Sequence, residues 1–150
     1  MIKSPFTTFA RIDLDAIAAN VRALANHSAG AELFAVVKAN AYGHGAVQVA
    51  RIALKNGATR LAVARPDEAI QLRRAGIAAS ILVMGYALPD EIVDVVEHGI
   101  TPTITTINAA QAISARAQAL GKTALIHVKV DTGMGRGGLL PEEVDRKSVV

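Results

Sequence analysis

The sequence predicts an α/β fold of about five βα units with parallel strands, and two observations support this prediction. Short apolar runs recur along the chain, and their first residues lie 28, 20, 20 and 24 positions apart, the length of a strand, a helix and their connections. Most of these runs are continuously apolar, which suits strands that are covered on both faces. The expected strands are residues 32–38, 60–64, 80–85, 100–106 and 124–130.

The first elements precede this repeat. The segment "TTFARIDL" (7–14) alternates between apolar and polar residues and predicts a leading strand. Residues 15–28 follow with apolar positions at the helical period, and Asp13 or Asp15 is placed to cap that helix.

Helices are expected after each of the first four apolar runs, and their ends carry recognisable signals. Proline opens two of them, acids fill their first turns, and glycine follows the last turn. The expected helices are 45–56 before Gly57, Pro66 to Gly76, Pro89 to Gly99, and a last helix capped by Asn108 and ended by Gly121. The chain finishes on "LLPEEVDRKSVV" without a sixth unit. Periodicity alone fits either part of a (β/α)₈ barrel or a doubly wound sheet.

Composition excludes several classes of function. The 150 residues suggest one domain, and 51% hydrophobic residues argue against disorder. The net charge is +3, but the 16 Lys and Arg are scattered, so we expect no nucleic-acid partner. No run approaches the roughly 18 apolar residues of a membrane span, and the N-terminus shows no signal peptide. The absence of cysteine fits a cytoplasmic protein.

The stretch "LFAVVKANAYGHG" (33–45) places a lysine where a buried strand ends. In parallel α/β folds the carboxyl ends of strands open onto the ligand. A lysine amine in partly apolar surroundings is a good nucleophile toward an aldehyde. The following loop offers Tyr42 as a hydroxyl donor, Gly43 and Gly45 for close backbone approach, and a helix start near Gly45 that favours phosphate. Lys38 and this loop therefore suit pyridoxal 5'-phosphate. The same residues also fit a strand-end lysine that reaches water beside glycines that turn the chain.

Two long motifs resemble those of the alanine racemase family. "AVVKANAYGHG" resembles the family's pyridoxal phosphate attachment motif, and "VKVDTGMGRGG" (128–138) resembles its second signature, with Gly137 in place of the usual aliphatic residue. "RIDLDAIAANV" also resembles the family's opening. The resemblance covers essentially the whole chain but only the first part of a typical family member. It implies a partial TIM (β/α)₈-type barrel.

The resemblance assigns roles to four residues. It implies that Lys38 holds the cofactor through an imine and, once freed, moves the α-proton of the amino acid. Tyr42 is then a ligand of the cofactor phosphate. Arg136 contacts the phenolic oxygen of the cofactor ring and helps to seat the substrate carboxylate, a task suited to a forked guanidinium. Lys129 matches a lysine that is often carbamylated in the family, which would turn a cation into an anion able to hold Arg136.

Strand alternation predicts which residues near the second motif face inward. His127, Lys129 and Asp131 share one face of the expected strand 124–130, and Ile126, Val128 and Val130 share the other. We expect the polar set to face the barrel interior.

The other polar residues of these motifs have plainer interpretations. We favour an interior, hydrogen-bonded role for His127, a loop role for His44, an anchoring role for Asp131 in its own loop, and a packing role for Met134. Tyr86 is a weaker candidate for the mouth of the site. The four histidines are scattered without metal-ligand spacing, so no metal site is expected.

By resemblance, the whole protein is a pyridoxal phosphate-dependent alanine racemase that supplies D-alanine for peptidoglycan and acts as a cytoplasmic homodimer. The resemblance also implies that the last barrel strands and a C-terminal β domain, which carries a second catalytic tyrosine, are absent here. The strand 7–14 would then be an unprotected edge. We therefore expect the isolated chain to have little activity. Two alternatives stay open: a non-enzymatic pyridoxal phosphate-binding barrel, and another racemase or decarboxylase of the same fold type.

Overall fold

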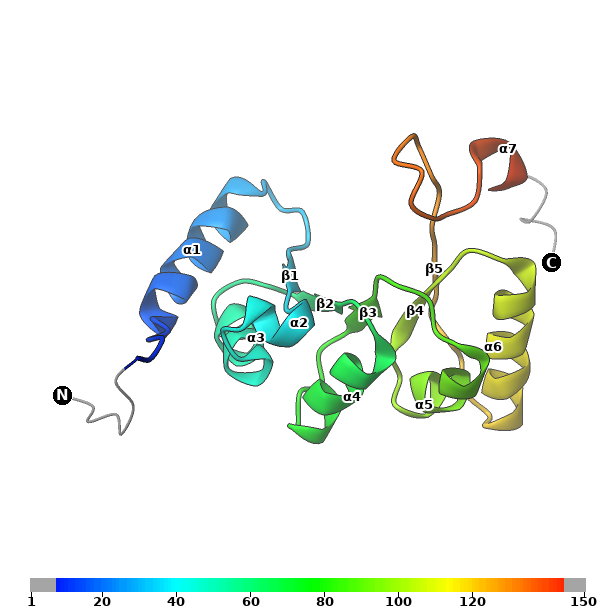
Figure 1. The fold of residues 1–150 in the computed structure, drawn as a ribbon, viewed down its shortest axis with the longest axis horizontal. Coiled ribbons are helices and arrows are strands. Elements are labelled where there is room, and N and C mark those ends of the chain that lie inside the picture. Colours follow the sequence, from blue (N-terminus) through cyan, green and yellow to red (C-terminus); the bar gives the residue numbers. More distant parts are fainter. Residues whose placement is uncertain (1–7, 145–150) are drawn as a thin grey trace.

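Five short parallel strands form the centre of the molecule in a computed structural model that describes residues 8–144 (Figure 1). Each strand lies within one of the apolar runs, and the ends of the runs form the connections. The strands are β1 (Phe34–Val36), β2 (Arg60–Val63), β3 (Ile81–Val83), β4 (Thr101–Ile104) and β5 (His127–Val128). The five predicted strands and their parallel direction are thus confirmed.

The strand order distinguishes the two architectures that the sequence left open. The strands follow the order β1-β2-β3-β4-β5, so every strand pairs with its neighbours in sequence. A doubly wound sheet would reverse its order at a switch point, and none occurs. The sheet also curls, because the rings of Phe34 in β1 and His127 in β5 meet at 6.4 Å between centroids. In a flat sheet strands four positions apart would lie about 19 Å from each other. The fold is therefore part of a barrel.

The helices cover the outer side of this curled sheet. In Figure 1, α3, α4 and α5 follow its lower side, with α1 at one end and α6 near the other. The bounds are α1 (Leu14–His27), α2 (Lys38–Tyr42), α3 (Ala46–Lys55), α4 (Pro66–Arg74), the 3₁₀ turn η1 (Pro89–Glu91), α5 (Ile92–Glu97), α6 (Ile107–Ala119) and α7 (Pro141–Val144). Apart from α2 and α7, they correspond to the predicted helices.

Two buried clusters join the helices to the sheet. The larger one packs α3 and α4 on β2 and β3, with Leu61, Leu72 and Ile81 wholly buried. The smaller one packs α5 and α6 on β4 through Val96, Ile104 and Ile113. Aliphatic and alanine side chains fill both clusters, as the scarcity of aromatic residues requires.

Two predictions about local structure were wrong. Residues 8–13 form no strand, and Leu14 already belongs to α1 (residue 7 lies outside the described part). The expected cap of α1 is confirmed, because the Asp13 carboxylate accepts hydrogen bonds from Asp15 N and Ala16 N at 3.0 Å. The cap of α6 is Thr106, whose hydroxyl accepts from Ala109 N, so the expected cap Asn108 lies within the helix. Between residues 8 and 144 no helix combines the length and apolarity needed to cross a membrane.

Candidate active site

A cleft of about 520 Å³ opens at the carboxyl ends of the five strands. Its lining begins with Lys38 after β1 and Ala64 after β2, and continues through Thr103 in β4 to the end of β5. The remaining lining residues are Met84, Gly85, Tyr86, His127, Val128, Lys129, Arg136 and Gly137. This is the end of a parallel barrel where ligands bind.

Lys38 enters the cleft from a left-handed turn. Ala39, Asn40, Ala41 and Tyr42 all have positive φ angles, between 50° and 55°, so that α2 is a left-handed turn rather than an ordinary helix. Each non-glycine residue in this region costs about 1–2 kcal/mol. Such strain is characteristic of functional sites, where surrounding contacts hold it in place.

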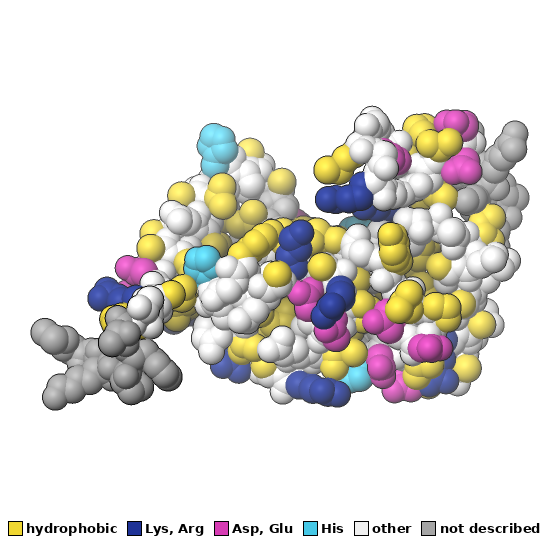
Figure 2. Space-filling view, in the orientation of Figure 1, with side chains coloured by type: hydrophobic (Ala, Val, Ile, Leu, Met, Phe, Trp, Pro, Cys, Tyr) yellow, Lys and Arg dark blue, Asp and Glu magenta, His cyan; other side chains and the backbone are white. Residues whose placement is uncertain are grey.

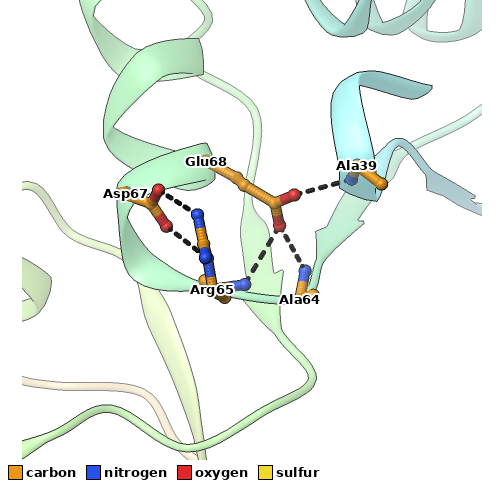
Figure 3. A network of polar contacts seen from close by, with 5 residues as sticks. All are labelled: Ala39, Ala64, Arg65, Asp67 and Glu68. Carbon is orange, nitrogen blue, oxygen red and sulfur yellow. Dashed lines mark hydrogen bonds and ion pairs between the residues drawn. The ribbon is translucent and has the colours of Figure 1, made fainter. Parts of the chain in front are cut away.

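Contacts at both ends hold this turn. At its start, Ala39 N donates a hydrogen bond of 2.6 Å to Oε1 of Glu68 in α4, whose other oxygen accepts from Ala64 N (Figure 3). At its end, Ala46 N donates to the Asn40 side-chain oxygen at 2.8 Å. Because the turn is held at both ends, the backbone of Lys38 has a defined place beside β2.

The loop after β5 carries Arg136 and is closed at its neck. Asp131 N donates to Leu139 O, and Leu139 N donates to Lys129 O, both at 2.8 Å. Gly138 is required at this neck, because a Cβ there would lie 2.7 Å from Asp131 N. Figure 2 shows Lys and Arg side chains gathered beside this loop.

Asp131 anchors the interior of the same loop, as predicted. Its Oδ1 accepts hydrogen bonds from Gly133 N at 2.9 Å and Gly135 N at 3.0 Å. Backbone hydrogen bonds, that of Gly135 first and then that of Gly133, hold the pKa of Asp131 below its ordinary value. Two of the three expected inward-facing residues, His127 and Lys129, line the cleft. Of the residues expected on the other face, Ile126 lines a second, apolar hollow, whereas Val128 borders both that hollow and the cleft.

Most of the predicted site residues therefore come together, and one lies apart. Lys38, Lys129 and Arg136 line the same cleft, although they are up to 98 positions apart in the sequence. Tyr42 does not line the cleft and is 61% exposed, but its ring centroid lies 5.9 Å from Lys38 Nζ. His127 lines the cleft and packs edge-to-face on Phe34, but it is exposed, so the interior role expected for it is wrong.

Sequence reasoning missed several residues of the site. Gly85 allows the ends of β2 and β3 to approach, because a Cβ there would lie 2.5 Å from Ala64 O. Thr103 and Met84 line the cleft from within predicted strands, so strand periodicity was their only signal. Glu68 is one of the acids in the first turn of the helix that Pro66 opens, and its contact with Ala39 could not be inferred from that position.

The residues of the cleft suit a phosphorylated aldehyde. A primary amine, a second lysine, a guanidinium and an imidazole line it, and no carboxylate does so among residues 8–144. A dianionic phosphate bound in this cleft would therefore lie beside cationic side chains and would not be repelled by carboxylates. The volume is in the range of small-molecule sites, which extends from about 300 to 1,000 Å³. Pyridoxal 5'-phosphate fits this set of groups.

Fold and site together define a partial (β/α) barrel with a lysine amine at the end of its first strand. Residues 12–148 match the family described as "Alanine racemase, N-terminal domain", and the chain belongs to this family. The alanine racemase of Desulforamulus reducens is 52% identical over 136 residues, which cover 90% of this chain. The crystal structure of alanine racemase from D-cycloserine-producing Streptomyces lavendulae matches 96% of the chain with a TM-score of 0.90 and 42% identity.

The structural likeness extends to a racemase of another amino acid. The histidine racemase of Leuconostoc mesenteroides subsp. sake matches 88% of the chain with a TM-score of 0.80 and 31% identity. The chain spans 36% to 38% of the length of these three proteins. The family and the partial barrel predicted from the sequence are thus confirmed.

Proposed function

We propose that this chain is the cofactor-binding part of an alanine racemase, which interconverts L-alanine and D-alanine and supplies D-alanine for peptidoglycan. One observation carries the proposal: Lys38, Lys129 and Arg136 line a single cleft at the strand ends, and no carboxylate lines it within residues 8–144. The 52% identity to an alanine racemase supports the choice of reaction.

In this proposal the residues of the chain have separate tasks. Pyridoxal 5'-phosphate supplies an aldehyde that condenses with an amine, with loss of water, and a pyridine ring that takes up the electron pair left by the departing α-proton. Lys38 offers the amine for attachment and then accepts or returns the α-proton at Nζ. Arg136 would bind oxygen anions of the cofactor and substrate, and Tyr42, which lies beside Lys38 but outside the cleft lining, would donate to the phosphate. Carbamylated Lys129 would be an anion that holds Arg136.

The cellular setting is also part of the proposal. The whole protein acts in the cytoplasm, consistent with a sequence that has no cysteine. It acts as a homodimer. Neither a nucleic acid nor a membrane is a proposed partner.

A racemase of another amino acid is the second candidate, favoured by the likeness to a histidine racemase. The cleft has room at Gly137, where a Cβ would meet no atom within 4 Å. In deuterium oxide the cofactor-loaded chain is expected to exchange the α-proton of alanine faster than that of histidine. Faster exchange of histidine would select the second candidate.

Reductive trapping tests the attachment. The chain is incubated with pyridoxal 5'-phosphate, reduced with borohydride, digested and mapped. The pyridoxyl label is expected on Lys38, and it should disappear in Lys38→Ala. Lys55→Ala is the matched control, because Lys55 is an exposed lysine at the end of α3. A label on another lysine, or none at saturating cofactor, would overturn the proposal.

A further inference from the structure

Glu68 connects the peptide that follows Lys38 to the end of the neighbouring strand. Its Oε1 accepts from Ala39 N at 2.6 Å, and its Oε2 accepts from Ala64 N at 2.7 Å and Arg65 N at 3.1 Å (Figure 3). The side chain is half-buried, so these charge-assisted bonds are partly shielded from water. One carboxylate thus joins the segments that follow β1 and β2.

Helix capping accounts for only one of these three contacts, that with Arg65 N. Glu68 occupies the third position of α4, where an acid commonly accepts from the N-cap amide. Glu91 and Glu143 do the same in their own helices, accepting from Leu88 N at 2.7 Å and Leu140 N at 2.9 Å. In the described part of the chain, neither of these two carboxylates bonds to another segment, so the Ala39 contact is particular to Glu68.

We propose that Glu68 is a positioning residue for Lys38, an inference that rests on the function proposed above. Ala39 is the first residue of the left-handed turn, with a φ of 50°. The bond from its N–H to Glu68 fixes the peptide plane between residues 38 and 39 and holds the turn in its strained conformation. Without this bond the turn relaxes toward the right-handed region, and the amine of Lys38 loses its fixed place beside Ala64 and Gly85 in the cleft.

Glu68→Gln separates positioning from capping. Glutamine also serves in a capping box, so its oxygen can still accept from Ala64 N and Arg65 N. Its NH₂ group then faces Ala39 N–H, donor against donor. Glu91→Gln is the matched control, because Glu91 caps its own helix and does not contact the left-handed turn α2.

Two measurements follow from this pair of variants. In Glu68→Gln, pyridoxal 5'-phosphate should label Lys38 about tenfold more slowly, the effect of losing one charged hydrogen bond, while labelling of other lysines stays unchanged. In the cofactor-free protein the Ala39 amide should exchange with deuterium about tenfold faster. Glu91→Gln should leave both rates at the wild-type value. If Glu68 had only a structural role, the rate at which Lys38 is labelled would fall in each variant only as far as the thermal stability of that variant falls.

A rescue variant covers the case in which Glu68→Gln folds poorly. Ala39→Gly removes the steric cost of the positive φ, so adding it to Glu68→Gln should restore part of the labelling rate. Absence of rescue, or wild-type exchange at Ala39 in Glu68→Gln, would overturn the positioning role. If wild-type Lys38 takes no label, the proposed function fails, and the exchange rate of Ala39 still decides the role of Glu68.

Discussion

At the scale of single residues, Asp131 shapes the loop that brings Arg136 to the cleft. Its carboxylate accepts from the amides of Gly133 and Gly135, and these bonds favour the ionised form. Because the pKa of Asp131 in the folded protein lies below its ordinary value of 3.8, ionised Asp131 stabilises the loop at and above that pH. This stabilisation is lost as the pH falls through the lower, folded pKa.

An acid titration followed by NMR should show this linkage. The amide shifts of Gly133 and Gly135 are expected to change together, with a midpoint below pH 3.8, while circular dichroism confirms that the fold is intact. In Asp131→Asn the side-chain oxygen can still accept one or both bonds, so the loop should form without that titration. A midpoint at or above 3.8, or the same titration in the asparagine variant, would contradict the assignment.

The site residues that could be predicted from the sequence are those marked by a strand end or a motif. Lys38 was predicted because it ends an apolar run, and parallel strands bring such positions to one edge. Lys129 was predicted from its motif and from the alternation of the expected strand 124–130. Arg136 was predicted from its motif. The role of Glu68 depends on a partner 29 residues away and on a turn of unusual hand, and neither leaves a periodic signal.

At the scale of elements, the left-handed turn α2 is the feature that local propensity misses. Alanine, asparagine and tyrosine normally avoid successive positive φ angles, so the segment reads as a loop. The ends of the helices could be predicted, because proline, acidic residues and glycine mark them. The sequence could not distinguish Thr106 from Asn108 as the N-cap of α6, because the two residues lie within two positions of each other. The expected strand 7–14 alternates in sequence, but within the described residues no neighbouring strand pairs with it.

Arg73 connects several elements at the end of the barrel opposite the cleft. From the last turn of α4 its guanidinium donates to four backbone carbonyls, those of Ile77, Ala79, His98 and Gly99, at 2.6 to 3.1 Å. Burial lowers its pKa. These carbonyls belong to the loops before β3 and β4, so one side chain links α4 to two strands. Residues at this end of a parallel barrel serve stability rather than chemistry.

Replacement of Arg73 should therefore lower stability and spare the site. Arg73→Met is expected to reduce the free energy of unfolding by about 2 kcal/mol, because a charged donor to four carbonyls is lost. Urea denaturation measures this change, with the exposed neighbour Arg74→Met as the control, for which we expect a change below about 0.5 kcal/mol. Pyridoxyl labelling of Lys38 at low temperature should be the same in both variants. Equal stability of the two variants would show that the four bonds contribute little.

At the scale of the whole molecule, the curled sheet gives the cleft one wall. The order β1 to β5 leaves the outer edges of β1 and β5 unpaired among residues 8–144. Beside the β5 edge lies an apolar hollow of about 670 Å³ between α6 and β5, with Ile126 and Val128 partly exposed. This larger hollow is lined mainly by apolar side chains and is separate from the lysine cleft. Lys38, Lys129 and Arg136 thus face a space that residues 8–144 do not enclose on the side opposite the sheet.

This open side leads to a prediction for the 150-residue chain by itself. Racemisation removes a proton from one face of the α-carbon and returns it to the other, so groups are needed on both sides of the substrate. The five strands place Lys38 on one side, and only two tyrosines, Tyr42 and Tyr86, occur in the chain, both more than 60% exposed. The chain is therefore expected to take the label at Lys38, yet to form D-alanine from L-alanine no faster than Lys38→Ala. A D-amino-acid oxidase assay measures this rate. Turnover clearly above that of Lys38→Ala would mean that the described cleft already supplies both proton-transfer groups, with His127 and Lys129 as the first to test.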